Sequence, residues 1–435
     1  MLRTRRQGSG LCGGTLPHRA HRRGFREHTR RPALIDSLPH PLAMRCLWIT
    51  RQDPRPADSG ELIYSLGLIR SLAAQPGIEL TVLAHHATKS CEDESAVTWQ
   101  FHGHIPEGRL RSLTSPLPAD AFRLGNRHQR EALGRLLTRS WDWIIIDQAA
   151  CAWALPFIPP KTLLAYIAHN HEATLRHEVA RNERGPMPLK LALRWDARKY
   201  SRLERRLCKR ADLVTAITPH DADTFRSELA DQPVLTLLPG FEGRIPAKAP
   251  RQFTVDSPRV VVLAGAFEWL AKRRNLERFL HAARRPFQEG GIRFQVIGKA
   301  DPEWFQSLAR QHPWADFKSN VPAIDPYLGQ ARIGLIPEAL GGGFKLKALD
   351  YIFRGLPVAS IDKALSGLPI DPFSEAITAS DPESLASKVV SRIDDLRFLN
   401  HAAHSALAAC RQAFHWKDRG PALAAALKNP HPHRS

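Results

Sequence analysis

The chain is organised around residues 331–360, which read ARIGLIPEALGGGFKLKALDYIFRGLPVAS. The apolar run Ile333–Ile336 is typical of a buried strand, and residues 356–360 have the same character. Between them, three consecutive glycines precede residues 344–353, where apolar side chains recur at helical spacing. Strand, glycine loop, helix and strand predict a parallel βαβ unit, because parallel neighbours need such a crossover.

The glycine loop, Gly341–Gly343, suits an anion, because free backbone N–H groups and the dipole at a helix start favour negative charge. Lys345 and Lys347 fall in the first turn of the predicted helix, where a cation is unfavourable unless an anion binds beside it. A flexible turn is the alternative, since one glycine-rich loop is a weak motif. The spacing fits neither the G-x-x-x-x-G-K-[ST] phosphate loop nor the G-x-G-x-x-G dinucleotide fingerprint.

Composition limits the class of protein. The 435 residues suffice for two ordinary domains, and 43% hydrophobic with 24% charged residues is typical of a globular chain with a buried core. The net charge is +19, of which residues 1–43 contribute +7 through nine arginines against two acidic residues. Such a balance indicates nucleic acid, an anionic membrane or phosphorylated ligands as partners. Because few aromatic residues lie among the basic runs, we expect no nucleic acid.

The six cysteines stand far apart, with no C-x-x-C pair and no His/Cys cluster: Cys12, Cys46, Cys91, Cys151, Cys208 and Cys410. This pattern predicts reduced thiols in a cytoplasmic protein without structural zinc. No apolar run reaches the roughly 18 residues that a membrane-spanning helix needs. Residues 1–43 lack the apolar core of a secretory signal. They are a transit peptide, a disordered basic extension, or sequence upstream of a start at Met44, and we favour the last two.

From Met44 onward, strand-like apolar runs alternate with helical patterns. The predicted strands include residues 46–50, 78–84, 143–147, 163–168, 213–218, 234–238, 259–264 and 294–297, and the longer helices include 121–140 and 189–210. Residues 243–257 are polar and contain proline, as expected of a linker. We therefore predict an α/β protein with two Rossmann-like, doubly wound domains, residues 44–242 and 258–412, and a terminal segment, residues 413–435. Ligands of such sheets bind beyond the carboxyl ends of the strands, here in a cleft between the halves.

With both halves placed, the chain resembles a retaining glycosyltransferase of the GT-B fold, of the family 4 type (glycosyl transferases group 1), over about residues 44–427. GGGFKLKALD at 341–350, followed by RGLPV at 354–358, is similar to the family pattern G-x-G-x-[KR]-x-K-[IV]-L-E…G-x-P-V. The resemblance implies that the C-terminal domain binds a nucleotide diphosphate sugar. It also implies that the N-terminal domain accepts the second substrate and that a terminal helix, after residues 414–416, crosses back to it.

The resemblance assigns donor binding to Gly341, Gly342, Gly343, Lys345, Lys347 and Asp350. Asp350 stands where the family's glutamate holds the ribose. Gly342 replaces a second, sugar-contacting glutamate, for which nearby Glu338 is a candidate substitute. In the loop 265–275, Arg274 with Arg273 or Lys272 is the counterpart of the cations that face the diphosphate, although Ala266 stands where the family often has arginine. A solvated basic loop is the alternative.

In the N-terminal half, Gly60 in the segment DSG resembles the glycine loop that approaches the donor. His169 follows a strand end, where the family often has a histidine facing the reaction centre, and it is our candidate catalytic residue; a structural histidine is the alternative. We interpret Glu204 and Asp212 as structural. Residues 221–223 form a D-x-D, a metal motif in another glycosyltransferase fold. Here it follows Thr-Pro at a predicted helix start, which favours helix capping and no required metal.

The resemblance thus implies transfer of a hexosyl-type sugar from a nucleotide diphosphate donor to a hydroxyl acceptor, with retention and without metal or cofactor, in polysaccharide or glycoconjugate synthesis. The acceptor is expected to be a carbohydrate or a lipid-linked compound. The basic helices at residues 121–140 and 176–210 suit peripheral contact with the inner face of a membrane, with a solvated face as the alternative. The rival functions are an epimerase of sugar nucleotides or a phosphorylase of the same fold, and a non-catalytic, basic GT-B-like binding protein.

Overall fold

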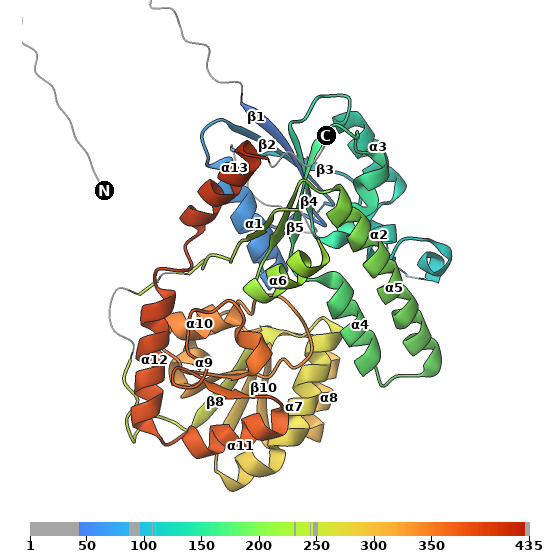
Figure 1. The fold of residues 1–435 in the computed structure, drawn as a ribbon. Helices are drawn as coiled ribbons and strands as arrows, with labels where there is room; N and C mark the ends of the chain where they lie inside the picture. Colours follow the sequence, from blue (N-terminus) through green and yellow to red (C-terminus); the bar gives the residue numbers. More distant parts are fainter. Residues whose placement is uncertain are drawn as a thin grey trace, which may run out of the picture. The chain divides into compact units, whose positions relative to one another are not determined.

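The computed structural model describes residues 43–86, 96–106, 108, 110–229, 232–243, 245–246 and 251–430. The chain divides into residues 1–41 and residues 42–435, and the second unit contains every element described below (Figure 1). The predicted basic extension lies outside the described residues except for Ala43. The cysteines within them are buried, free thiols, as predicted: Cys46, Cys151, Cys208 and Cys410.

The first sheet has seven parallel strands in the order β3-β2-β1-β4-β5-β6-β7. They are β1 (Met44–Ile49), β2 (Ile78–Ala84), β3 (Thr98–Phe101), β4 (Trp143–Asp147), β5 (Leu163–Ala168), β6 (Leu213–Ala216) and β7 (Val234–Thr236). Successive side chains of β1 enter different cores: Leu47 belongs to the core on one face and Trp48 to the core on the other. Burial on both faces explains the continuous apolar runs.

The helices of this half are α1 (Gly60–Ala73), α2 (Ala119–Leu124), α3 (Arg127–Leu136), α4 (Glu172–Asn182), α5 (Met187–Arg210) and α6 (Pro219–Glu228), with 3-10 segments η1 (Leu110–Thr114) and η2 (Ala149–Phe157). The helix predicted at 121–140 is wrong as a single element. It is divided into α2 and α3 because Gly125 ends the first helix and Asn126 caps the second, its side chain accepting from the Gln129 N–H.

The second sheet has six parallel strands in the order β10-β9-β8-β11-β12-β13. They are β8 (Val260–Ala266), β9 (Arg293–Lys299), β10 (Ala315–Ser319), β11 (Ile333–Ile336), β12 (Val358–Ile361) and β13 (Ile377–Ala379). Its helices are α7 (Leu270–Glu289), α8 (Pro302–Gln311), α9 (Asp325–Gln330), α10 (Lys347–Phe353) and α11 (Pro382–Arg392), with a 3-10 segment η3 (Asp362–Leu365). Two doubly wound parallel sheets confirm the predicted fold class.

The C-terminal segment returns to the first half, as predicted. After α12 (Leu396–Cys410), which packs in the second half, come a 3-10 turn η4 (Trp416–Asp418) and α13 (Arg419–Lys428), and Figure 1 shows α13, in red, beside α1, in blue. Leu423 and Leu427 are buried in the core of the first half, and Trp143 donates its indole N–H to the Leu427 carbonyl at 3.0 Å. Gly67 of α1 packs directly against the Trp416 ring, where a side chain on residue 67 would have no room.

No helix within the described ranges is long and apolar enough to cross a membrane.

Candidate active site

Two topological switch points bring the predicted site together. The strand order reverses between β1 and β4 in the first sheet and between β8 and β11 in the second. Residues beyond the carboxyl ends of these strands therefore border a crevice. Asp147 ends β4 and His169 follows β5, whereas Phe267 follows β8 and Glu338 follows β11. The candidate site is built from these loops and the glycine loop.

Three half-buried lysines and one buried carboxylate lie around the glycine loop, and we call Lys272, Lys345, Lys347 and Glu338 the lysine cluster. Lys347 Nζ lies 2.5 Å from Glu338 Oε1, and Glu338 Oε2 is buried without a hydrogen-bond partner among the described residues. Lys345 Nζ donates to the Gly342 carbonyl at 2.5 Å. Within the cluster three cations face one carboxylate, so the cluster carries an excess of positive charge, which Glu61 and Glu268 offset in part at Lys272.

The pKa directions in the cluster follow first from burial. Burial lowers the pKa of Lys345 to about 8; Glu338 opposes this shift, and Lys347 and Lys272 add to it. Burial and Lys347 likewise lower the pKa of Lys272. Burial alone would raise the pKa of Glu338, but the charge and hydrogen bond of Lys347 hold that pKa below its usual value. A bound anion would remove the repulsion among the lysines.

The helix behind the glycine loop is shorter than predicted, which corrects one part of the anion argument. The predicted helix 344–353 begins only at Lys347 and has seven residues. Lys345 therefore lies before the helix, and its ammonium turns back onto the glycine-loop carbonyls. Of the two lysines predicted in the first helical turn, only Lys347 lies there, and anion binding at this loop stays a prediction.

The glycine loop lies directly against the N-terminal half. Gly343 has φ +67°, and a Cβ there would lie 2.6 Å from both the His169 carbonyl oxygen and Asn170 Oδ1. A Cβ on Gly342 would lie 3.2 Å from Asn170 Oδ1. Asn170 therefore occupies space that a side chain at position 342 would enter, which gives a physical reason for glycine in place of the family's glutamate.

His169 is held by a buried carboxylate that the sequence prediction missed. Its Nε2 lies 2.7 Å from Asp147 Oδ1, while Asp147 Oδ2 accepts from Trp48 Nε1 at 3.1 Å and from Thr50 Oγ1 at 2.9 Å. Burial would raise the pKa of Asp147, but the adjacent His169 and these donors lower it. The sequence contained a signal for this residue, because the apolar run WIIID ends in an acid. Asp147 has no exposed surface, and a fully buried carboxylate requires polar partners.

Backbone strain lies next to this pair. Gln148 follows Asp147 with φ +71° and ψ 144°, a region that is strained for residues other than glycine. Its N–H donates to the Ile167 carbonyl at 3.0 Å, so the strained residue ties the end of β4 to β5. Strain of this kind clusters at functional sites, and here it adjoins the buried acid.

The remaining donor-side residues are placed as follows. Asp350 accepts from Arg354 at 2.7 Å and is one-third exposed; burial raises its pKa although Arg354 opposes the rise. Arg274 pairs with Glu277 at 3.0 Å, and Arg273 donates from Nε to the Phe267 carbonyl at 2.9 Å. The structure therefore brings Lys272 into the lysine cluster and engages the two predicted arginines elsewhere. Donor contact by Arg273, Arg274 and Asp350 stays a prediction.

The predicted glycine at position 60 faces the second half. A Cβ on Gly60 would lie 3.4 Å from Leu346 Cδ1, next to the lysine cluster. Two residues earlier, Asp58 lies 3.2 Å from Lys299 Nζ at the end of β9, and Glu268 lies 3.2 Å from the same nitrogen. The loop after β1 and the loop after β8 thus share one lysine across the crevice.

The acids interpreted as structural are confirmed in that role. Thr218 caps α6 by accepting from the Asp221 N–H, and the Asp221 carboxylate accepts from the Thr218 hydroxyl at 2.6 Å. Glu204 accepts from the Tyr166 hydroxyl at 2.8 Å, and burial raises its pKa to about 8. Asp212 accepts from the Leu164 N–H at 2.8 Å. Among the described residues, no group of three or more His, Cys, Asp or Glu side chains is placed to hold a metal ion.

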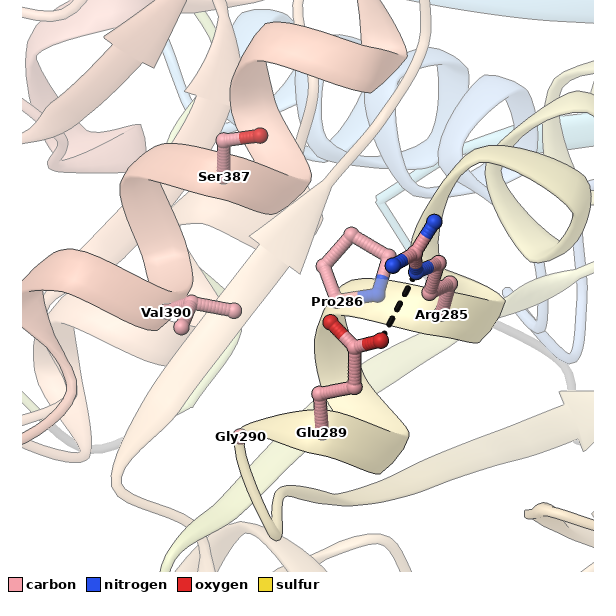
Figure 2. A pocket seen from close by; sticks show the side chains of 6 residues that line it. All are labelled: Arg285, Pro286, Glu289, Gly290, Ser387 and Val390. Atoms are coloured by element: carbon pink, nitrogen blue, oxygen red, sulfur yellow. Dashed lines mark hydrogen bonds and ion pairs between the residues drawn. The ribbon is translucent and has the colours of Figure 1, made fainter.

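A separate hollow lies between α7 and α11, away from the lysine cluster (Figure 2). It is lined by Arg285, Pro286, Glu289, Gly290, Ser387 and Val390, with a volume of about 490 Å³. Arg285 Nε bonds Glu289 Oε1 at 2.7 Å, so its two charged residues satisfy each other. It offers a ligand no unpaired charge, and we assign it no role.

Comparison with known proteins agrees with this architecture. Residues 258–395 match the family model described as glycosyl transferases group 1. No curated protein sequence matches the chain. Sucrose-phosphate synthase from Thermosynechococcus elongatus has a similar structure, with a TM-score of 0.66 and 14% identity over 88% of this chain and 98% of that one.

Two further solved structures share the architecture. HepE from Anabaena, in complex with UDP-glucose, has a TM-score of 0.59 and 12% identity over 88% of this chain and 99% of that one. The UDP-forming trehalose-phosphate synthase from Burkholderia xenovorans, in complex with glucose-6-phosphate, has a TM-score of 0.58 and 14% identity over 89% and 100%. At these identities the likeness establishes the fold. Residues 258–395 are therefore a domain of the glycosyl transferases group 1 family, in a chain whose two parallel sheets have the GT-B fold.

Proposed function

We propose that the protein transfers a hexosyl-type sugar from a nucleotide diphosphate sugar to a hydroxyl acceptor, with retention and without a metal. The observation that carries the proposal is the contact between Gly343 and the His169 carbonyl. It places the lysine cluster of one half beside the His169–Asp147 pair of the other. A donor diphosphate and an acceptor hydroxyl need such charges and polar groups on opposite sides of one crevice.

On the donor side, the lysine cluster has the chemistry of a diphosphate site. Three lysines and one carboxylate leave positive charge that a diphosphate neutralises. The same charge stabilises the nucleotide as it departs, because negative charge develops on it in the transition state. Asp350, partly exposed in the first turn of α10, suits two ribose hydroxyls. The UDP-glucose bound by the similar protein HepE supports a UDP-sugar as the donor.

On the acceptor side, His169 is the proposed catalytic residue and Asp147 a positioning residue. Their hydrogen bond at 2.7 Å sets the orientation and tautomer of the imidazole ring. The Tyr64 ring packs edge-on against it, with centroids 4.9 Å apart, which restricts the ring further. A fixed imidazole can bond a sugar hydroxyl without reorganising during the reaction. Glucose-6-phosphate in the similar trehalose-phosphate synthase supports a carbohydrate acceptor.

We further propose that the product belongs to polysaccharide or glycoconjugate synthesis in the cytoplasm, and that the acceptor is a carbohydrate or a lipid-linked compound. Asn170 occupies the space that a side chain at position 342 would enter, so the sugar end of the site differs from the family pattern. Glu338 is the carboxylate that we propose for that end, and its unpartnered Oε2 supports a hydrogen bond to a sugar hydroxyl.

The first experiment is a thermal-shift screen of nucleotide diphosphates and their sugars with the full chain. A ligand at about 100 times its Kd stabilises the native state by about 2.7 kcal/mol, which is readily measured. Product analysis with the best donor then tests the reaction: a glycoside with the donor's anomeric configuration, formed equally with a chelator present, is expected. An isomerised donor without acceptor would show an epimerase. Binding of no nucleotide diphosphate would favour the non-catalytic alternative.

A further inference from the structure

The outward face of α5 has an apolar part followed by a basic part. Its first turns expose Met187, Leu191 and Trp195, at 58%, 57% and 41% of their surface. The next turns on the same face expose Arg198 and Arg202, followed by Arg205, Arg206 and Lys209. Apart from the adjacent Arg205 and Arg206, successive members stand three or four residues apart, so they lie on one face of the helix. We call these eight residues the α5 stripe.

A fourth apolar side chain extends the first part of the stripe. Leu113 of η1 is 46% exposed, and its carbonyl accepts from Trp195 Nε1 at 3.3 Å. Lys199 Nζ donates to the Ser112 carbonyl at 2.7 Å and fixes η1 on α5. Exposed apolar side chains gathered on one face mark an interaction site, whereas single ones such as Phe373 are normal on a soluble surface.

The charge on this face is uncompensated. None of the basic members of the stripe pairs with a carboxylate within the described residues, whereas Arg210, at the end of α5, pairs with Asp212. The two acids of α5 are engaged elsewhere. Asp196 accepts from the Ala119 N–H at 2.7 Å, and Glu204 is buried. The face therefore attracts anions without opposition from its own helix.

We propose that the α5 stripe binds an anionic lipid bilayer, with Leu113, Met187, Leu191 and Trp195 at the boundary of headgroups and acyl chains. Apolar and aromatic side chains beside a run of arginines are what such a boundary accommodates. The arginines then lie over the lipid phosphates, each contributing electrostatic attraction. A nucleic acid would use the arginines but not Met187 and Leu191, and a second copy would bring a like charge against the stripe.

The stripe lies one helix away from the crevice. Helices α4 and α5 form an antiparallel pair, seen side by side in Figure 1. On α4, Glu178 lies 3.9 Å from Lys363 of η3, and Glu183, just beyond α4, lies 3.4 Å from Arg274 of α7. A bilayer on the outer side of α5 is therefore close to the loops that border the proposed active site. Membrane binding itself does not depend on the proposed function.

The test is co-sedimentation of the full chain with vesicles of phosphatidylcholine alone and of phosphatidylcholine mixed equally with phosphatidylglycerol. We expect binding to the anionic vesicles that weakens as salt is added, because exposed charges are screened. Arg198→Gln with Arg202→Gln should reduce the binding constant about fivefold for each charge. Met187→Ser with Leu191→Ser should reduce it about tenfold for each side chain removed from the bilayer.

Matched controls separate the stripe from general charge and hydrophobicity. Arg310→Gln with Lys318→Gln removes two exposed charges from the second half, and Phe373→Ser removes an apolar side chain that is 87% exposed. Both controls should bind like the wild type, and all variants should keep the wild-type unfolding midpoint. The proposal is overturned if the wild type does not bind anionic vesicles at low salt. Loss of binding in the charge variant but not in the apolar variant also overturns it, since the surface would then use charge alone.

Discussion

Arg274 of α7 lies 3.4 Å from Glu183, which follows α4 in the other half of the molecule. Glu183 is nearly inaccessible and also accepts from the Gly185 N–H at 2.5 Å, whereas Arg274 is about one-third exposed. The arginine that the sequence assigns to the donor therefore connects the C-terminal sheet to the hairpin that carries the α5 stripe. Its charge joins the two halves across the crevice.

Removing this ion pair should impair closure of the crevice. Arg274→Gln is expected to raise the donor KM about two- to fivefold, the range set by a partly exposed pair. Less complete exclusion of water should also raise the fraction of donor that is hydrolysed without acceptor. Glu183→Gln should act similarly, since the amide keeps the bond to the Gly185 N–H. Arg226→Gln, which breaks the Arg226–Asp223 pair within one half, is the control and should change neither quantity.

The buried pair Lys347–Glu338 should matter for both stability and donor binding. Lys347→Met leaves the Glu338 carboxylate buried without its cation and is expected to cost about 3 kcal/mol in unfolding free energy. Combining it with Glu338→Gln should recover most of that loss in thermal unfolding, yet transfer activity should stay at least about 100-fold low. Full activity of the double variant would remove the lysine cluster from the mechanism. Arg285→Met, in the exposed pair with Glu289, should leave the unfolding midpoint unchanged.

Donor binding should weaken with rising pH through Lys345. Its pKa is lowered to about 8 from an ordinary value of 10.5, so the free protein loses this charge above about pH 8. The donor Kd should then rise about tenfold per pH unit, because binding must take up a proton. Lys345→Arg keeps its charge in this range and should abolish that dependence. A pH dependence shared by wild type and Lys345→Arg would assign it to another group.

The same lowered pKa of Lys345 predicts that the free protein becomes more stable as the pH rises, whereas donor binding becomes weaker. Between about pH 8 and 10.5 the unfolded chain holds a proton on Lys345 that the folded chain has lost. Loss of the Lys345 proton from the folded chain therefore raises the unfolding free energy as the pH increases across that window. At neutral pH, the poorly solvated ammonium of Lys345 lowers the unfolding free energy. Chemical unfolding of wild type and Lys345→Met at several pH values measures it: the advantage of the methionine variant at neutral pH should shrink as the pH rises.

Asp147→Asn tests whether Asp147 acts by positioning the His169 ring. The variant keeps the shape of the buried side chain but removes the charge beside His169. We expect kcat to fall by at least about 100-fold with little change in donor KM, because the ring loses the partner that orients it. His169→Asn should lower kcat to a similar level, and the double variant should be no worse than either single one. Additive losses would show that the two residues act independently.

Gly343→Ala tests the contact between the glycine loop and the N-terminal half. With φ +67° and a backbone oxygen 2.6 Å from the added Cβ, the alanine should cost about 1–3 kcal/mol or displace the loop. Donor affinity should fall as well. Gly134→Ala is the matched control: this glycine lies within α3 with open space around its Cβ, and alanine should stabilise the helix by up to about 1 kcal/mol.

The sequence predicted most of the strands that are buried on both faces. Strands β4 and β5 were predicted with their observed bounds because both faces are covered and no polar residue interrupts them before Asp147. The edge strands β3, β10 and β13 were missed. TWQF and ADFKS are partly exposed and lack a continuous apolar run, and β13 has only three residues. The linker boundaries could not be tested in full, because residues 244 and 247–250 lie outside the described ranges.

By itself the sequence determined the α/β alternation, the glycine loop, and the lysines and histidine that carry the proposed chemistry, because each depends on residue type and local spacing. Tertiary structure alone decided which of these meet. It paired His169 with Asp147 from another strand, turned Lys345 onto the glycine loop, and placed Asn170 against Gly342. Contacts between residues far apart in the chain depend on sheet order and on how the halves pack. The glycine loop is therefore a predicted anion site by sequence, and it borders a two-sided crevice only in the folded chain.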